Sequence, residues 1–370
     1  LSCFLVFLCV LFIWEEAKFK EYSICLLLIG FFLVLVFTVQ NILAFYVAFE
    51  AILIPMYIII GVWGSRERKI RAVYLFFFYT LVGSLVMLLG ILYIQTKVHS
   101  LDYSDVYNYK FTSFEVRCLW FAFFIAFASK IPMFPLHIWL PEAHVEAPTV
   151  GSVLLAGILL KLGVYGFFRF NLTFFLPACL YFNPLINILG LIGIIYASLS
   201  ALRQTDLKRI IAYSSIAHMN LIVVGLLSLH FTAVIGAILQ SLSHGFVSGG
   251  MFFLIGILYS RYHTRFLYYY GGLVHFMPVF SGFFLIFTMA NIALPGTSNF
   301  IGEFLLLYGI FNLSKMLGFV ATLGVILSGA YSLWLYNRII FGNIKISYTK
   351  VFQDLNLREF VILFSLLITP

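Results

Sequence analysis

The chain has 370 residues, of which 63% are hydrophobic and only 10% are charged, and its net charge is +8. Soluble domains carry about 25% charged residues, so this composition excludes an ordinary soluble protein and indicates an all-α polytopic membrane protein. The sequence contains no Lys/Arg run typical of nucleic-acid binding, so we interpret the net positive charge as a signal of membrane topology.

Apolar stretches separated by short polar loops predict about twelve transmembrane helices in a single integral membrane domain, 1–370. They lie near 1–14, 22–38, 42–62, 72–95, 117–139, 148–170, 183–201, 209–228, 231–259, 278–311, 318–341 and 357–370.

Two of the predicted helices contain residues that interrupt a helix. The span 117–139 includes Pro132 and Pro135, and the span 278–311 includes Pro295. The second span is also longer than the roughly 20 residues that cross a bilayer. We therefore expect each to be a discontinuous helix whose free backbone groups can hold water.

The basic residues divide unevenly between the two sides of a twelve-helix topology. Fifteen of the 22 fall on the side reached after the first helix, called side A. Two lie inside spans, and five lie on side B: Lys97, Lys110, Arg117, Arg169 and Lys315. By the positive-inside rule, side A is the matrix or cytoplasmic side.

The predicted helices also divide into two similar halves. The first half, 22–170, and the second, 183–341, each contain five helices, with the broken helix fourth in each, and 357–370 begins a terminal helix. Because five is odd, the second half crosses the membrane in the opposite orientation. Inverted repeats with discontinuous helices are typical of transporters.

Four ionisable residues fall deep inside predicted spans: Glu50, Lys130, Lys161 and Glu303. A charge at the centre of a membrane helix costs roughly 2.5–3.5 kcal/mol on insertion scales, so such residues usually pair, face a wet cavity and carry function. Separate structural ion pairs are the alternative, but four charges of both signs on four helices favour one proton conduit. A buried lysine gains or releases its proton as a carboxylate approaches or withdraws.

Other polar residues could extend this conduit. His218 and His244 lie near the middle of their spans with serines close by, and they either relay protons or form structural hydrogen bonds. Lys208 is predicted to begin its helix, as a topology charge or as the side-A entrance of the relay. His144 and the glutamates beside it are expected in a side-A loop.

The residue pattern does not predict a metal or redox centre. The five cysteines form neither a CxxC pair nor a Cys/His metal spacing, and HIWLPEAH lacks the HExxH arrangement of zinc sites. We therefore expect no metal, haem or iron–sulfur cluster in this chain.

Several stretches resemble a known family. PLHIWLPEAHVEAPTVGSVLLAGILLKLGVYG, TDLKRIIAYSSIAHMN, LSHGFVSGGMFFLIG and LPGTSNFIGEF are similar to the antiporter-like proton-pumping subunits of respiratory complex I. LAFYVAFEAILIPMYIIIGVWGSRERKIRA most resembles the chain 4 subfamily, mitochondrial type. The resemblance covers about 40–340. Family members usually have fourteen helices, so we expect the first two to be absent or encoded separately and the last to be cut short.

The resemblance implies roles for three residues of the first half. Glu50 matches the essential glutamate that pairs with the lysine of the broken helix, which matches Lys130. Lys161 matches the lysine that bridges the two half-channels.

It likewise implies roles in the second half. His218 and His244 match histidines of the central axis. Glu303 matches the glutamate near the proton exit in chain 4, where the sister subunits, chains 2 and 5, carry a lysine.

The resemblance also implies the setting. The chain would be a translocase subunit of proton-translocating NADH:ubiquinone reductase, beside the antiporter-like chains 2 and 5 and lipids. It would bind no cofactor itself, since NADH, flavin, iron–sulfur clusters and ubiquinone belong to partner subunits. The 43 phenylalanines suggest an AT-rich gene and a multi-pass protein of the mitochondrial inner membrane, with plastid and bacterial homologues left open.

Two other functions remain open. A subunit of a stand-alone sodium/proton antiporter shares most of the charged pattern, but GVWGSRERKIRA and Glu303 argue against it. A structural membrane scaffold would need its charges only to hold helices together. A quinone-binding redox subunit is less favoured, because no ligand cluster or quinone pocket motif is visible.

Overall fold

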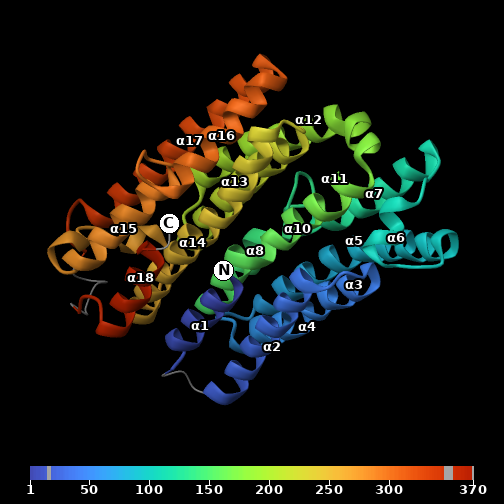
Figure 1. The fold of residues 1–370 in the computed structure, drawn as a ribbon. Helices are drawn as coiled ribbons and strands as arrows, with labels where there is room; N and C mark the ends of the chain where they lie inside the picture. The colour runs from blue at the N-terminus through green and yellow to red at the C-terminus, as the bar shows by residue number, and fades with distance from the viewer. Residues whose placement is uncertain (15–17, 346–352, 369–370) are drawn as a thin grey trace.

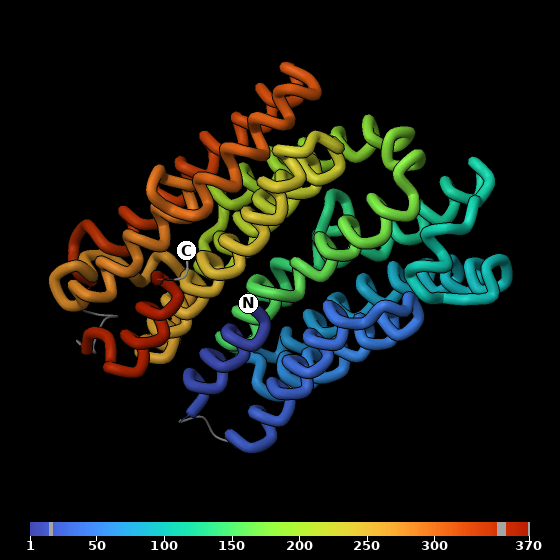
Figure 2. Tube along the Cα trace, viewed as in Figure 1, coloured from blue at the N-terminus to red at the C-terminus, as the bar shows by residue number. Residues whose placement is uncertain are grey.

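The computed structural model describes residues 1–14, 18–345 and 353–368. The described residues form helices that run side by side in an elongated bundle (Figure 1). Residues 19–108 occupy one flank and residues 278–340 the other, with the middle of the chain between them (Figure 2). Residues 357–368 lie beside the first helix and the long helix 231–262.

The first helix and those that follow it up to residue 174 lie in the predicted order. They are α1 (Ser2–Phe12), α2 (Phe19–Thr38), α3 (Ile42–Ala51), α4 (Leu53–Trp63), α5 (Lys69–Val98), α6 (Tyr103–Asn108), α7 (Ser113–Lys130) and α8 (Trp139–Glu146). One rod then combines α9 (Thr149–Leu154), the π turn η1 (Leu155–Leu159), α10 (Leu160–Gly166), the π turn η2 (Phe167–Asn171) and α11 (Leu172–Phe174).

The second half begins with three long helices. These are α12 (Leu176–Arg203), α13 (Leu207–Leu227) and α14 (Phe231–Tyr262). The 3-10 turns η3 (Leu267–Tyr269) and η4 (Leu273–His275) lead to α15 (Pro278–Asn291), α16 (Ser298–Leu313), α17 (Lys315–Ile340) and α18 (Leu357–Ile368).

Each predicted span coincides with a helix or with an interrupted helix in the described part of the chain, and the all-α membrane fold is confirmed. Eight described helices are long and apolar enough to cross a membrane by length and composition. The total of twelve crossings, the division into halves and their inversion stay predictions. One boundary was too late: α12 begins before the predicted 183, because Pro177 sits in its first turn and Pro184 is accommodated inside it.

Both predicted breaks are present. Helix α7 ends at Lys130, and α8 begins only at Trp139, whose indole Nε1 donates to the Ser129 carbonyl at 2.9 Å. Between α15 and α16, the Asn299 amide donates to the Ala290 carbonyl at 2.9 Å and bridges the break. Gly296 has φ +100°, a conformation that glycine adopts without strain.

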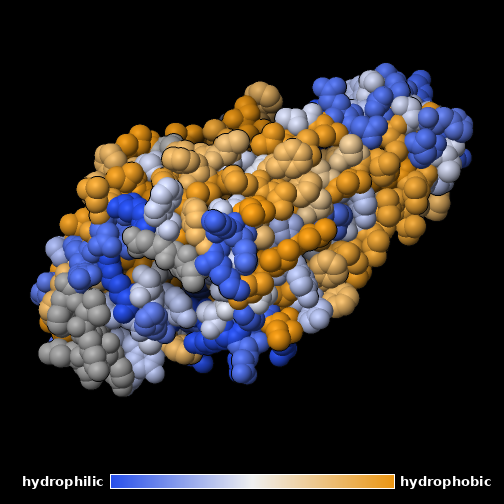
Figure 3. Space-filling view, turned by 90° about the horizontal axis from the view of Figure 1, so that it is seen from below, coloured by the Kyte–Doolittle hydropathy of each residue, from blue (hydrophilic) through white to orange (hydrophobic). Residues whose placement is uncertain are grey.

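The surface is apolar around the bundle. Figure 3 shows hydrophobic side chains over most of its length and hydrophilic ones gathered toward the two ends. Large apolar side chains such as Leu89, Phe319 and Ile326 are more than half exposed. This distribution suits a protein whose middle faces lipid.

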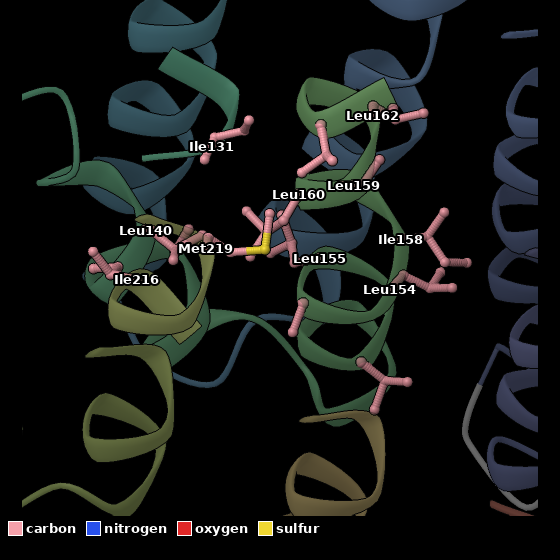
Figure 4. Packing of buried hydrophobic residues seen from close by; sticks show 14 of the residues in the cluster. Ile131, Leu140, Leu154, Leu155, Ile158, Leu159, Leu160, Leu162, Ile216 and Met219 are labelled. Atoms are coloured by element: carbon pink, nitrogen blue, oxygen red, sulfur yellow. The ribbon is translucent and has the colours of Figure 1, made fainter. Parts of the chain in front are cut away.

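The core lies on the central helices. The rod Thr149–Phe174, α13 and α14 are almost entirely buried, unlike the outer spans. Near the middle, Leu155 and Leu160 of the rod approach Met219 of α13 (Figure 4). Polar side chains on these helices therefore lie inside protein rather than against lipid.

A candidate functional site of buried ionisable residues

Four predicted site residues form one row through the core. The Lys161 Nζ lies 2.8 Å from the His244 Nδ1. The rings of His244 and His218 have centroids 5.6 Å apart, and the His218 Nδ1 lies 2.9 Å from the Glu303 Oε1. The row joins α10, α14, α13 and α16, and all four side chains are buried. It brings together residues that are far apart in the sequence.

Local helix geometry presents Lys161 to the row. The π turn η1 immediately precedes α10, and the Lys161 ammonium donates to the Ala156 carbonyl within that turn. Isolated π turns inside helices are frequent at functional sites. Because an ammonium has only donors, a charged Lys161 requires the His244 Nδ1 to accept. The contact can therefore be made by a charged lysine with a neutral imidazole or by a neutral lysine with an imidazolium.

The other end of the row is held by close packing of α14 and α16. The Gln240 Nε2 donates to the Glu303 Oε1 at 3.2 Å. At Gly302, an added Cβ would lie 2.8 Å from the Gln240 Cα, so only glycine lets the two backbones approach this closely. The neighbouring carboxylate is thus fixed against α14.

The row contains buried polar atoms that have no hydrogen-bond partner among the described residues. They are the Nε2 atoms of His218 and His244 and the Glu303 Oε2. Buried polar atoms are nearly always bonded, to protein or to ordered water. A cavity of about 10 Å³ lined by His218 and Glu303 is close to the space that one water molecule needs.

Lys130 and Glu50 are neighbours but not a contact ion pair. The Lys130 Nζ donates to the Phe49 carbonyl at 2.8 Å and lies 3.2 Å from the centroid of the Phe49 ring. Glu50, the next residue, interacts electrostatically with Lys130, yet no N–O contact within 4.0 Å joins them in the described chain. The Glu50 Oε1 is buried without a hydrogen-bond partner among these residues. The carboxylate has therefore not closed on the lysine.

The residue after Lys130 packs against the helix that carries Lys161. Ile131, directly after Lys130, packs where a side chain at Gly163 would otherwise lie, two residues beyond Lys161. The seven predicted site residues thus form a row, a separate pair and Lys208.

Lys208 is a buried group rather than a surface topology charge. It lies in the first turn of α13, capped by Asp206, and is only 2% exposed. Its Nζ donates to the Ala147 carbonyl at 2.7 Å and lies 3.5 Å from the Ser152 Oγ. Lys208 also lines a cavity of about 420 Å³ together with Ser65, Tyr259 and other residues of predicted side-A ends.

An arginine outside the spans holds this region together. Arg265 is only 1% exposed, with its Nη2 3.8 Å from the Glu146 Oε1 and its Nε 3.9 Å from the Asp206 Oδ2. Burial lowers the pKa of Arg265, and the two acids oppose that effect. The Leu207 amide donates to the Arg265 carbonyl at 3.0 Å, so the start of α13 is anchored beside α8.

The predicted position of His144 was wrong. The structure places it in α8, wholly buried and stacked on Phe252 with ring centroids 4.6 Å apart, not in a loop. It interacts electrostatically with both Lys208 and Lys161. Neither of its ring nitrogens has a hydrogen-bond partner in the part of the chain that the structure describes. The residues between the predicted spans 117–139 and 148–170 were expected to form a loop, whereas Trp139–Glu146 forms α8.

No group of three or more His, Cys, Asp or Glu residues that could hold a metal ion occurs within 1–14, 18–345 and 353–368. The ionisable side chains instead form pairs and a row, an arrangement suited to passing protons between neighbouring groups.

Comparison with known sequences agrees with this geometry. The chain is 52% identical over 370 residues to NADH-ubiquinone oxidoreductase chain 4 of Chondrus crispus and 53% identical over 370 residues to that of Arabidopsis thaliana. Each alignment covers 100% of this chain and 75% of the relative. The resemblance to the chain 4 subfamily is confirmed.

Solved structures share the fold. A chain of respiratory complex I from Thermus thermophilus with bound NADH matches with a TM-score of 0.91 at 31% identity, covering 100% of this chain and 77% of that one. A chain of the Mrp complex from Dietzia matches with a TM-score of 0.84 at 19% identity, covering 93% and 65%, and shows the fold alone. The family described as NADH:quinone oxidoreductase/Mrp antiporter, TM matches residues 39–328. The chain therefore belongs to the NADH:quinone oxidoreductase/Mrp antiporter transmembrane family.

Proposed function

We propose that the chain is a proton-translocating membrane-arm subunit of NADH:ubiquinone oxidoreductase, in which buried Glu, Lys and His side chains carry the protons. The observation that carries the proposal is the row Lys161–His244–His218–Glu303. The similarity of all 370 residues of this chain to chain 4 of NADH-ubiquinone oxidoreductase supports the placement in that enzyme. Oxidation of NADH and reduction of ubiquinone take place in partner subunits.

Proton transfer along the row uses the two nitrogens of each imidazole. Lys161 passes a proton to the His244 Nδ1, and His244 releases one from its Nε2 toward His218. The ring centroids are 5.6 Å apart, so this step needs a ring rotation or a bridging water. His218 then delivers a proton from its Nδ1 to Glu303 at 2.9 Å. Each transfer leaves the donor neutral, and each histidine then carries its proton on the other ring nitrogen. The rings must therefore turn, or exchange protons with water, before the next proton passes.

The Glu50–Lys130 pair acts as the switch of the first half. A carboxylate that approaches a buried ammonium favours its protonated form, and its withdrawal favours release of the proton. In the structure Lys130 is held by the Phe49 carbonyl, and the Glu50 Oε1 has no hydrogen-bond partner among the described residues. Closing and opening of this pair would alternately load and discharge Lys130.

Lys208 connects the conduit to side A. It lines the side-A cavity and lies beside Ser152, whose hydroxyl donates to the His144 carbonyl at 3.2 Å. We propose that protons enter from the matrix through Lys208 and His144 to Lys161, and leave toward side B from Glu303. Moving one charge against 100 mV costs about 2.3 kcal/mol, so redox energy from partner subunits must drive the cycle.

The proposed setting is the mitochondrial inner membrane, with the antiporter-like chains 2 and 5 as neighbours in the membrane arm. The similarity to chain 4 of plants and algae supports this setting. The buried row itself supplies no redox group, so the chain would act as a pump module driven from outside.

A native gel tests the assignment to the enzyme. Membranes are solubilised gently, the gel is stained for NADH dehydrogenase activity, and this chain is sought by mass spectrometry in the active band. We expect the chain in that band. A chain that migrates apart from the activity and supports sodium-dependent proton flux would contradict the proposal and favour the stand-alone antiporter.

A further inference from the structure

Helix α17 carries a buried polar face beside the end of the row. Three polar residues within about one turn of this helix are at most 2% exposed: Ser328, Tyr331 and Ser332. Ser328 lines the water-sized cavity that His218 and Glu303 also line. Positions three residues apart face the same way on a helix, so Tyr331 lies on the face that borders this cavity.

The Tyr331 hydroxyl is buried, and within the described residues it has no hydrogen-bond partner. It lies beside Ser214 of α13 and Asn291 of α15, and it interacts electrostatically with Glu303 of α16. The Glu303 Oε2 is likewise buried and unbonded among these residues. A buried donor and a buried acceptor that both lack a partner are costly, so a hydrogen bond between them would stabilise a second state of the protein.

Tyr331 also reaches the break of the second discontinuous helix. Asn291 is the last residue of α15, and its Nδ2 lies 3.4 Å from the Ser332 Oγ. Asn299, just inside α16, donates to the Ala290 carbonyl across the break. The Tyr331 hydroxyl therefore lies beside the polar side chain that ends α15 and interacts electrostatically with the carboxylate that ends the row.

We propose that Tyr331 is a positioning residue whose hydroxyl donates to the Glu303 carboxylate when it is ionised and turns to Ser214 or Asn291 when Glu303 is protonated. A phenol is a donor to a carboxylate, whereas the protonated acid no longer needs that donor. The charge of Glu303 is thereby linked to the contacts of Asn291 at the break. Arrival of a proton from His218 would release Tyr331 and change the polar contacts of α15.

The pH dependence of transport would reflect the ionisation of Glu303 and of the groups that face it. His218 faces it from α13 and Tyr331 from α17, and the neutral Gln240 faces it from α14. The elements around Tyr331 contribute Glu303 from α16, Ser214 from α13 and Asn291 from α15. His244 is one step further along the row. A change at Tyr331 therefore acts on the ionisation of Glu303 and, through it, of His218.

The test is Tyr331→Phe in the assembled enzyme, which removes only the hydroxyl. The matched control is Tyr336→Phe on the same helix, where the ring stacks on Phe284 with centroids 5.9 Å apart, away from the row. After native-gel verification of assembly, proton transport per NADH oxidised is measured in vesicles across pH 6–9. Tyr331→Phe should lower transport several-fold near neutral pH. It should also move the acid limb of the profile upward by about one pH unit, a tenfold change in an ionisation equilibrium.

The inference rests on the proposed role of Glu303, and two further variants separate the two ideas. If Glu303→Gln transports protons normally, the proposed function of the row is wrong. If Glu303→Gln stops transport but Tyr331→Phe matches Tyr336→Phe in rate and pH profile, only the role of Tyr331 is overturned. With both ideas correct, the double variant loses no more transport than Glu303→Gln alone, because Tyr331 acts through Glu303.

Discussion

The His218 Nδ1 lies 2.9 Å from the Glu303 Oε1, with both side chains about 4% exposed. The contact joins α13 to α16, and Gln240 of α14 donates to the same carboxylate oxygen. A buried carboxylate held by an imidazole can exchange one proton with it at little cost in geometry. This pair is the point at which the row Lys161–His244–His218–Glu303 meets the second discontinuous helix.

Replacing Glu303 with Gln should stop proton transport while the enzyme still assembles. Glutamine keeps the volume and can still bond to His218 and Gln240, but it cannot take up a proton. We expect transport coupled to NADH oxidation to fall about a hundredfold, the usual contribution of a proton-transferring group. The measurement is dye-monitored acidification of vesicles that contain the assembled complex.

The matched control for that variant is Glu142→Gln. Glu142 forms an ion pair with Arg209 at the protein surface, where both side chains are one-third exposed. Exposed pairs contribute about 0–1 kcal/mol, so this variant should assemble and transport nearly as the parent does. Equal losses in both variants would mean that the effect is not specific to the row.

Lys208→Met should slow proton uptake from side A. Lys208 lines the side-A cavity and bonds to the Ala147 carbonyl, and methionine fills similar space without a proton to carry. Lys69→Met is the control, because the Lys69 Nζ also donates to a carbonyl, that of Val62 at 2.9 Å, but does not line the cavity. Stopped-flow proton uptake should be slowed only by Lys208→Met, and unchanged uptake would remove Lys208 from the route.

Gly302→Ala should damage the α14–α16 contact. The new Cβ would lie 2.8 Å from the Gln240 Cα, and overpacking of this kind costs typically 1–3 kcal/mol. Gly282→Ala is the control, since no atom lies within 4 Å of a Cβ built there. In thermal unfolding of the assembled complex, only Gly302→Ala should lower the transition temperature. A stable Gly302→Ala variant would show that α14 and α16 can separate freely.

The helices were predictable from the sequence because lipid imposes a simple rule. A span must be long and apolar, and Pro132 and Pro295 cannot continue a helix, so both the spans and the breaks follow from local sequence. The charged site residues could also be predicted, because a residue such as Lys161 lies within an otherwise apolar span. These inferences need no knowledge of which helices pack together.

The order of the site residues could not be predicted in the same way. The row depends on how α10, α13, α14 and α16 pack, and hydropathy contains no information about such distances. The burial of His144 was missed because it falls between two predicted spans, whereas α8 lies in the core. The bond from Lys130 to the Phe49 carbonyl rather than to Glu50 is likewise a matter of side-chain geometry.

The most direct test of the central claim is proton transport per NADH in the assembled complex with Lys161→Arg. Arginine keeps the positive charge but does not release its proton, so it can replace a structural cation and not a proton carrier. If Lys161 passes protons to His244, the variant should assemble, as a native gel would show, and lose transport about a hundredfold. Normal transport by Lys161→Arg would contradict the account and leave the row as a structural lock between helices.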